Sequence, residues 1–191
     1  MKQFKILSAD AFVKNVGTPE QIEELKKQAL AAQASDSAGV LFTNEKCWRA
    51  QFQYSDISWL IKSLQDLVNQ AIEYYSKIDP LFTKKLSFYN NPTVDYWTNI
   101  NEPMGKNSLH NHGAYHFVAC YYIQVEGTGD LVFHNPANLL EECKPNSPFV
   151  SRIGITPKNG DLIVWPSWVP HEVELNTSQQ QRISIAFNIK F

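Results

Sequence analysis

The chain has 191 residues, of which 43% are hydrophobic and 13% aromatic, and its formal net charge is −2. A chain of this length can fold as one domain, residues 1–191, with a sizeable core, and its balanced charge gives no reason to expect a nucleic-acid partner. The three cysteines are far apart, and no apolar run is long enough for a signal peptide or a membrane span. We therefore expect a cytoplasmic protein without disulfides or membrane contact, whose oligomeric state stays open.

The first part of the chain, residues 1–84, is expected to form a mainly helical support region. Residues 2–7 alternate polar and apolar side chains, as a short strand does. A first helix is predicted to begin at Thr18, which can cap it, with Pro19 in the first turn and Gln21 closing a capping box. This helix should end in the loop of residues 35–39.

A second and stronger helix is predicted to open at Ser55 and Asp56. Its apolar residues recur at helical spacing over several turns: Trp59, Leu60, Leu64, Leu67, Val68, Ala71, Ile72 and Tyr75. A stripe of this kind packs against a core far more often than it holds a cofactor. Between the two helices, residues 40–44 and 46–54 have the composition and alternation of short strands.

Short β-rich segments fill the chain from residue 85 onward. Turn signals such as Asn91-Pro92 and Lys158-Asn159-Gly160 separate them. The segments are 85–92, 93–100, 116–125, 129–136, 149–157, 160–167, 171–176 and 182–191. Short strands after two helices predict a mainly β fold, a double-stranded β-helix (a cupin-like jelly roll) in residues 85–191, with the N-terminal helices packed on one sheet.

Three histidines suggest a metal site within this predicted roll. His110 and His112 are two positions apart, so on a β-strand both imidazoles would point to one face. His171 lies far along the chain at the start of another expected strand. Two histidines on one strand and a third on a distant strand are the usual layout of a mononuclear metal site in a β-barrel.

An ordered set of motifs resembles the small Fe(II)/2-oxoglutarate oxygenases. The set begins with W-x-N at Trp97 and Asn99, H-x-H at His110 and His112, and a strand ending in Tyr-Tyr at Tyr122. It continues with G-D-L-x-F-x-N-P, P-x-x-G-D-L-I-V-W-P-S-W-x-x-H-x-V and R-I-S-I-A-F-N. The sequence is most similar to a prolyl-hydroxylase-like group found mostly in phages and bacteria, and the resemblance covers roughly residues 95–191.

The resemblance implies a role for several of these residues. His110 and His171 take the places of two metal ligands. Arg182 takes the place of the arginine that grips the far carboxylate of 2-oxoglutarate, for which a planar guanidinium is suited. Ser184 and Tyr122 match hydroxyls that assist at the same carboxylate.

Other residues are expected beside these groups without a motif of their own. Asn99 is assigned with the cosubstrate-binding residues, while Trp97 and Asn188 are expected to line the pocket from neighbouring strands. Cys120 should pack inward as a small apolar residue, because no activating base surrounds it. His116 lies four residues after His112, which on a strand would place it on the same face.

The sequence departs from the wider superfamily at His112. The common facial triad has a carboxylate at this position and leaves open positions for 2-oxoglutarate and O2. Here the expected ligand set is His110, His112 and His171, with His116 as a possible replacement for one of them. A site of three histidines also binds Fe(II), but its different charge leaves the preferred metal open.

The resemblance implies a hydroxylase that uses Fe(II) and 2-oxoglutarate, converting the latter to succinate and CO2. Two alternatives remain: a cupin-like three-histidine metalloenzyme that does not use 2-oxoglutarate, and a non-catalytic jelly-roll binding module. The substrate, whether a prolyl residue, another peptide side chain, a nucleobase or a small metabolite, is not indicated. Residues 102–108 and 136–148 are the loops expected to cover the pocket.

Overall fold

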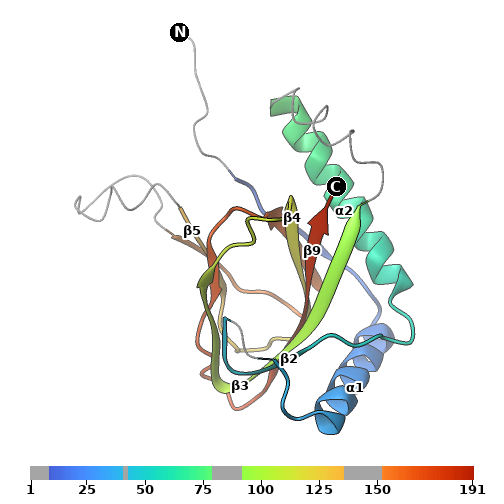
Figure 1. Ribbon diagram of the computed structural model, residues 1–191, viewed down its shortest axis with the longest axis vertical. Coiled ribbons are helices and arrows are strands. Elements are labelled where there is room, and N and C mark those ends of the chain that lie inside the picture. Colours follow the sequence, from blue (N-terminus) through green and yellow to red (C-terminus); the bar gives the residue numbers. More distant parts are fainter. Residues whose placement is uncertain (1–8, 41–42, 79–91, 136–151) are drawn as a thin grey trace, which may run out of the picture.

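The computed structural model describes residues 9–40, 43–78, 92–135 and 152–191 (Figure 1). The expected strands at residues 2–7 and 85–92 and the expected loop at residues 136–148 lie wholly or almost wholly outside these ranges. None of the described helices is long and apolar enough to cross a membrane.

Two helices lie on the same side of the molecule (Figure 1). Helix α1 spans Pro19–Ser35 and begins with the predicted capping box, in which Thr18 and Gln21 exchange side-chain to backbone hydrogen bonds. Helix α2 spans Ser58–Ile78, and the Asp56 carboxylate accepts hydrogen bonds from the backbone N–H and hydroxyl of Ser58. The second helix therefore begins slightly later than the sequence indicated, and Asp56 binds its first residue.

The strands of the described residues form one curled sheet in which every pairing is antiparallel. Its order is β1-β7-β4-β9-β3-β8-β5-β6, with β2 paired to β3. The strands are β1 Phe12–Asn15, β2 Asn44–Ala50, β3 Thr93–His110, β4 Phe117–Gln124, β5 Leu131–His134, β6 Arg152–Ile155, β7 Asp161–Pro166, β8 His171–Val173 and β9 Arg182–Lys190.

Strand β3 belongs to both walls of the roll. Its first half pairs with β9, and beyond its bend Asn107 and His110 pair with Val173 and His171 of β8. The backbone turns at Met104, whose φ is +66°, and Gly105 packs tightly against backbone atoms. The expectation of a pocket-covering loop at residues 102–108 is therefore wrong, because this segment is part of a bent strand.

Alternation along the strands creates two apolar regions. On β9, Ile183, Ile185 and Phe187 face the helices and join one core with residues such as Leu60 and Leu64 of α2. The opposite face of the sheet encloses a second, smaller cluster inside the roll: Val118, Tyr122, Val125, Leu131, Ile163, Trp165 and Val169. The fold is thus a double-stranded β-helix with both helices packed on one sheet, as predicted.

Candidate metal centre

Three imidazoles meet at one end of the roll. His110 ends β3 directly opposite His171 at the start of β8, and His112 follows in the loop after β3. The ring centroids of His110 and His171 are 4.4 Å apart, and that of His112 lies 5.0 and 5.2 Å from them. One nitrogen from each ring lies within 4.8 Å of the others, a spacing that a single metal ion can bridge.

Backbone carbonyls orient two of these rings. Nδ1 of His110 lies 2.7 Å from the carbonyl oxygen of Ser108, and Nδ1 of His171 lies 2.9 Å from that of Val169. Since a carbonyl only accepts, each Nδ1 carries the proton and each Nε2 keeps its lone pair. This is how proteins commonly fix the tautomer of a metal-binding histidine.

Burial keeps the cluster neutral. Burial first, and the neighbouring His110 ring second, lower the pKa of His171 to about 3 and that of His112 to about 4. The pKa of His110 is also lowered, again mainly by burial. Neutral imidazoles are the form that binds a cation, so the three rings offer a metal three lone pairs at neutral pH.

The chain brings His112 to this cluster in an unexpected way. Strand β3 ends at His110, so His112 does not lie on the strand, and a backbone hydrogen bond from His112 N–H to the Ser167 carbonyl holds the loop. A turn follows, which breaks the strand geometry on which the His116 expectation depended. Nδ1 of His116 accepts a hydrogen bond from the Phe191 N–H, and His116 does not line the cavity, so it is neither a pocket residue nor a replacement ligand.

A buried arginine lies deeper in the same cavity. Arg182, at the start of β9, is 1% exposed, and its Nη1 donates to the carbonyl oxygen of Gly129 at 2.7 Å. Its Nη2 has no hydrogen-bond partner within the described part of the chain. The guanidinium lies 5.1 Å from the centre of the Tyr122 ring. A buried cation with an unused donor is costly unless an anion completes it.

The other predicted site residues lie around this arginine on neighbouring strands. Tyr122 on β4, Ser184 on β9 and Asn99 on β3 are register partners in one row across the sheet, and all three line the cavity. Cys120 and Asn188 also line it, the latter beside His112. Burial raises the pKa values of Cys120 and Tyr122, so both groups are protonated at neutral pH.

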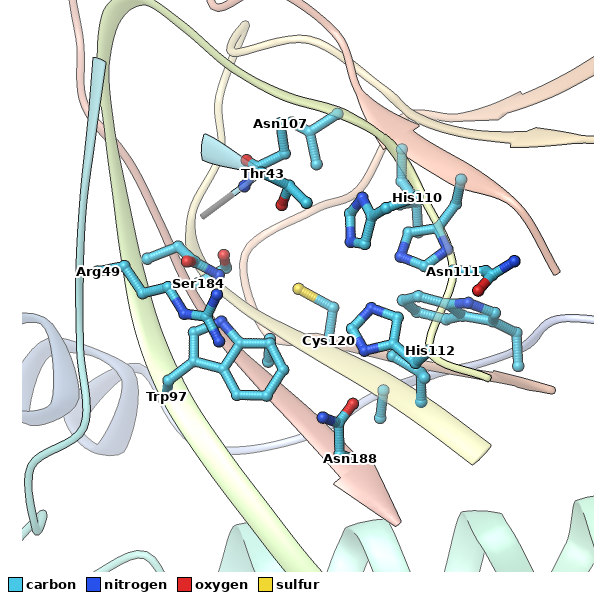
Figure 2. A pocket seen from close by; sticks show the side chains of 18 of the residues that line it. Thr43, Arg49, Trp97, Asn107, His110, Asn111, His112, Cys120, Ser184 and Asn188 are labelled. Atoms are coloured by element: carbon cyan, nitrogen blue, oxygen red, sulfur yellow. The ribbon is translucent and has the colours of Figure 1, made fainter. Parts of the chain in front are cut away.

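One wall of the cavity was not identified from the sequence. Arg49 on β2 stacks over Trp97 of β3, with its guanidinium carbon 4.3 Å from the centre of the ring (Figure 2). The alternation of residues 46–54 indicated that Arg49 and Trp48 face opposite ways, but nothing indicated which face is the cavity. Further lining residues had no sequence signal: Thr43, Asn101, Asn107, Asn111, Tyr115 and Trp165.

The part of the chain that holds most of this site is similar in sequence to a known protein family. The model of the family described as "Putative 2OG-Fe(II) oxygenase" matches residues 95–188. No curated protein matches the sequence significantly. A prolyl-4-hydroxylase from Pseudomonas putida is 13% identical, with a TM-score of 0.60 over 94% of this chain and 91% of that one.

Two further solved structures are similar. A prolyl hydroxylase from Trichoplax adhaerens, in complex with a hypoxia inducible factor peptide fragment, is 14% identical with a TM-score of 0.64, covering 94% of this chain and 83% of that one. HygX from Streptomyces hygroscopicus, with nickel and 2-oxoglutarate bound, is 12% identical with a TM-score of 0.63, covering 94% and 82%. At these identities the likeness establishes the shared fold.

A histidine cluster inside a double-stranded β-helix, together with the family match, defines the protein as an oxygenase enzyme. Residues 95–188 match the model of the 2OG-Fe(II) oxygenases, a class whose cofactors are Fe(II) and 2-oxoglutarate. The residues present fit both groups. Three neutral imidazoles suit the metal, and the unpartnered Nη2 of a buried arginine suits a carboxylate.

Proposed function

We propose that the protein is a dioxygenase that hydroxylates a small molecule or a peptide side chain and converts 2-oxoglutarate to succinate and CO2. His110, His112 and His171 hold Fe(II) through their free nitrogens. Arg182 binds the far carboxylate of 2-oxoglutarate, with Ser184, Tyr122 and Asn99 beside it. Bound iron and 2-oxoglutarate would supply the O2 chemistry, and the chain would supply position and protection.

The observation that carries this proposal is the relation between Arg182 and the histidines. The arginine is buried, its Nη2 is unpartnered in the described structure, and it lines the same cavity as the three rings. A ligand that bridges the two places needs an anionic end for the guanidinium and metal-binding atoms at the other end. A dicarboxylate with a keto group meets both needs.

The protein's own residues prepare the site for this ligand. Ser108 and Val169 fix the tautomers of His110 and His171, and Gly129 holds the Arg182 guanidinium from behind. Tyr122 stays protonated and can donate a hydrogen bond to the carboxylate. The apolar residues of the inner cluster, among them Val118 and Leu131, keep water from the buried end.

The proposal is tested by adding Fe(II) and then 2-oxoglutarate to the metal-free protein without oxygen. A keto acid chelated to Fe(II) gives a weak visible charge-transfer band, which we expect for the wild type and not for His110→Ala or His171→Ala. His116→Ala and His134→Ala are the matched controls, since neither ring lines the cavity, and both should keep the band.

The same experiment separates the alternatives. Iron binding without the band would indicate a three-histidine metalloenzyme that does not use 2-oxoglutarate. A wild type that binds no metal would refute the site assignment altogether.

A further inference from the structure

His112 differs from the other two histidines of the cluster in what orients its ring. The rings of His110 and His171 are each bound by the backbone carbonyl two residues earlier. His112 lies beyond the end of β3, where its backbone N–H donates to the Ser167 carbonyl. Within the described part of the chain, its ring makes its contacts with other side chains. Side chains must therefore set the direction in which its nitrogens point.

Two aromatic rings fix the plane of the His112 imidazole. The Trp97 indole stacks on it, with ring centroids 6.1 Å apart and planes 17° apart. The His171 ring is also nearly parallel to it, at 5.2 Å and 10°. Stacking alone does not distinguish the two orientations related by a half-turn about the Cβ–Cγ bond, which exchange a nitrogen and a carbon on each side of the ring. A hydrogen bond to one ring nitrogen does distinguish them.

Asn188 is the side chain placed to make this hydrogen bond. It follows Ser184 and Ala186 at the inward-facing positions of β9 and lines the cavity. Figure 2 shows its amide beside the His112 ring. Arg182 lies six residues earlier on the same strand, about 20 Å away along it. Asn188 therefore lies at the histidine end of the cavity, and Arg182 at the other end.

The side-chain oxygen of Asn188 is available as an acceptor. The residue is 7% exposed, and its Oδ1 is buried without a partner at hydrogen-bond geometry among the described residues. A buried amide oxygen without a hydrogen is unfavourable, and native structures rarely leave one so. Because the His112 ring lies beside this oxygen, a small rotation of either side chain would bring an imidazole N–H to it.

On this basis we infer that Asn188 is the positioning residue of His112, and that its Oδ1 accepts the ring N–H of His112 that faces away from the metal. The inference rests on the proposed function, because it takes His112 as a metal ligand. A neutral imidazole has one N–H and one lone pair. Once the N–H is bound to Asn188, the lone pair of the other nitrogen points toward His110 and His171. The loop-borne ligand thus gains the support that backbone carbonyls give to the other two.

The test uses the full chain, labelled with nitrogen-15 and loaded with Zn(II). Long-range proton–nitrogen spectra distinguish a protonated ring nitrogen from a metal-bound one, and His112→Ala identifies the signals of His112 among those of the five histidines. In the wild type we expect zinc on one nitrogen of His112 and, on the other, a proton that exchanges slowly with water. The zinc Kd is measured by competition with a chelator.

Variants assign the effect to Asn188. Asn188→Leu removes the acceptor at similar volume, so the His112 ring proton should exchange rapidly and the zinc Kd should rise about tenfold. Asn188→Asp keeps an oxygen in the same place and should keep the slow proton and a zinc Kd no higher than that of wild type. Lys190→Ala, at the exposed end of β9, should match wild type. Denaturant unfolding of the metal-free variants checks their folding, and Asn188→Ala replaces the leucine variant if that one does not fold.

Three results would overturn the inference: a slowly exchanging His112 proton that persists without the acceptor, a zinc Kd that stays within twofold of wild type in the same variant, or Asn188→Asp behaving like Asn188→Leu. The last result would show that the amide acts through packing alone. A wild type that binds no zinc would refute the proposed metal site and this inference together. Zinc binding without the charge-transfer band of iron and 2-oxoglutarate would refute the proposed function and leave the role of Asn188 in place.

Discussion

Arg182 is the residue whose environment most constrains what the cavity can bind. Its charge is almost fully buried, one edge of the guanidinium is held by the Gly129 carbonyl, and Nη2 is left for a ligand. Lysine could supply the charge but not the planar fork that meets a carboxylate with two parallel hydrogen bonds. Replacing Arg182 with lysine would therefore keep the positive charge and lose the two-point geometry.

We expect Arg182→Ala to weaken 2-oxoglutarate binding by roughly 100-fold or more, because loss of one partner of a buried charge pair costs about 3 kcal/mol. The 2-oxoglutarate Kd of Arg182→Lys should lie between those of Arg182→Ala and the wild type. The measurement is calorimetric titration of 2-oxoglutarate into nickel-loaded protein. Arg152→Ala, on the exposed strand β6, is the control. An Arg182→Ala Kd equal to that of wild type would remove Arg182 from the cosubstrate site.

The turn between β4 and β5 contains two glycines, one of which, Gly129, accepts a hydrogen bond from Arg182. Gly127 and Gly129 both have positive φ, +69° and +91°, where residues with a Cβ are strained. A Cβ on Gly129 would also lie 3.0 Å from the carbonyl oxygens of Glu174 and Leu175, whereas one on Gly127 would meet only Ser178 Cβ at 3.9 Å. The Gly129 carbonyl is the one that accepts from Arg182.

Alanine substitutions at these two glycines should therefore differ in their effect on 2-oxoglutarate affinity, although both destabilise the fold. Gly127→Ala should cost about 1 kcal/mol of unfolding free energy and leave 2-oxoglutarate affinity unchanged. Gly129→Ala should cost more and also weaken 2-oxoglutarate binding about tenfold, because the backbone must shift and carry the carbonyl with it. Denaturant unfolding and calorimetry measure the two effects. Equal 2-oxoglutarate affinity in both variants would show that the Gly129 carbonyl does not position Arg182.

Most elements were predictable because their side chains repeat at the period of the structure. The stripe of α2 and the alternation of β9 both follow from burial of one face against the shared core. Strand β1 was missed because it is a short edge strand whose side chains are mostly exposed, so it has no alternation. The predicted strand of residues 93–100 is shorter than β3, because the strand bends at Met104 and continues to His110 where a loop was expected.

The site was predictable only where side chains fall on strands. Arg182 and Ser184 were assigned from the family resemblance, and the alternation of β9 agrees with it, since both residues line the cavity together with Asn188. The prediction placed His112 beside His110 because both were expected on one strand. His112 does lie beside His110, but β3 ends at His110, so it is the loop after the strand that brings His112 there. Arg49 could not be assigned from sequence, since only the pairing of β2 with β3 shows that its face is the cavity wall.

At the scale of the whole molecule, a buried thiol links fold stability to alkaline pH. Cys47 on β2 is buried and pairs with Asn101 of β3, and its thiol donates a hydrogen bond to the Trp48 carbonyl oxygen at 3.3 Å. Burial raises the pKa of this thiol to about 12, from its ordinary value of 9.0. Between these two values the folded state holds a proton that the unfolded state has lost, so unfolding becomes easier as pH rises.

We therefore expect the unfolding free energy of the metal-free protein to fall above pH 9, with Cys47 contributing about 1.4 kcal/mol per pH unit until its folded pKa is reached. Tyr75, whose pKa burial raises to about 12, adds to the loss above pH 10. Denaturant unfolding at pH 8 and pH 10 measures the effect. Cys47→Ala lacks the thiol and should lose about 1 kcal/mol less over this interval than wild type. An identical loss in both proteins would mean that the thiol ionises as readily in the folded state as in the unfolded chain.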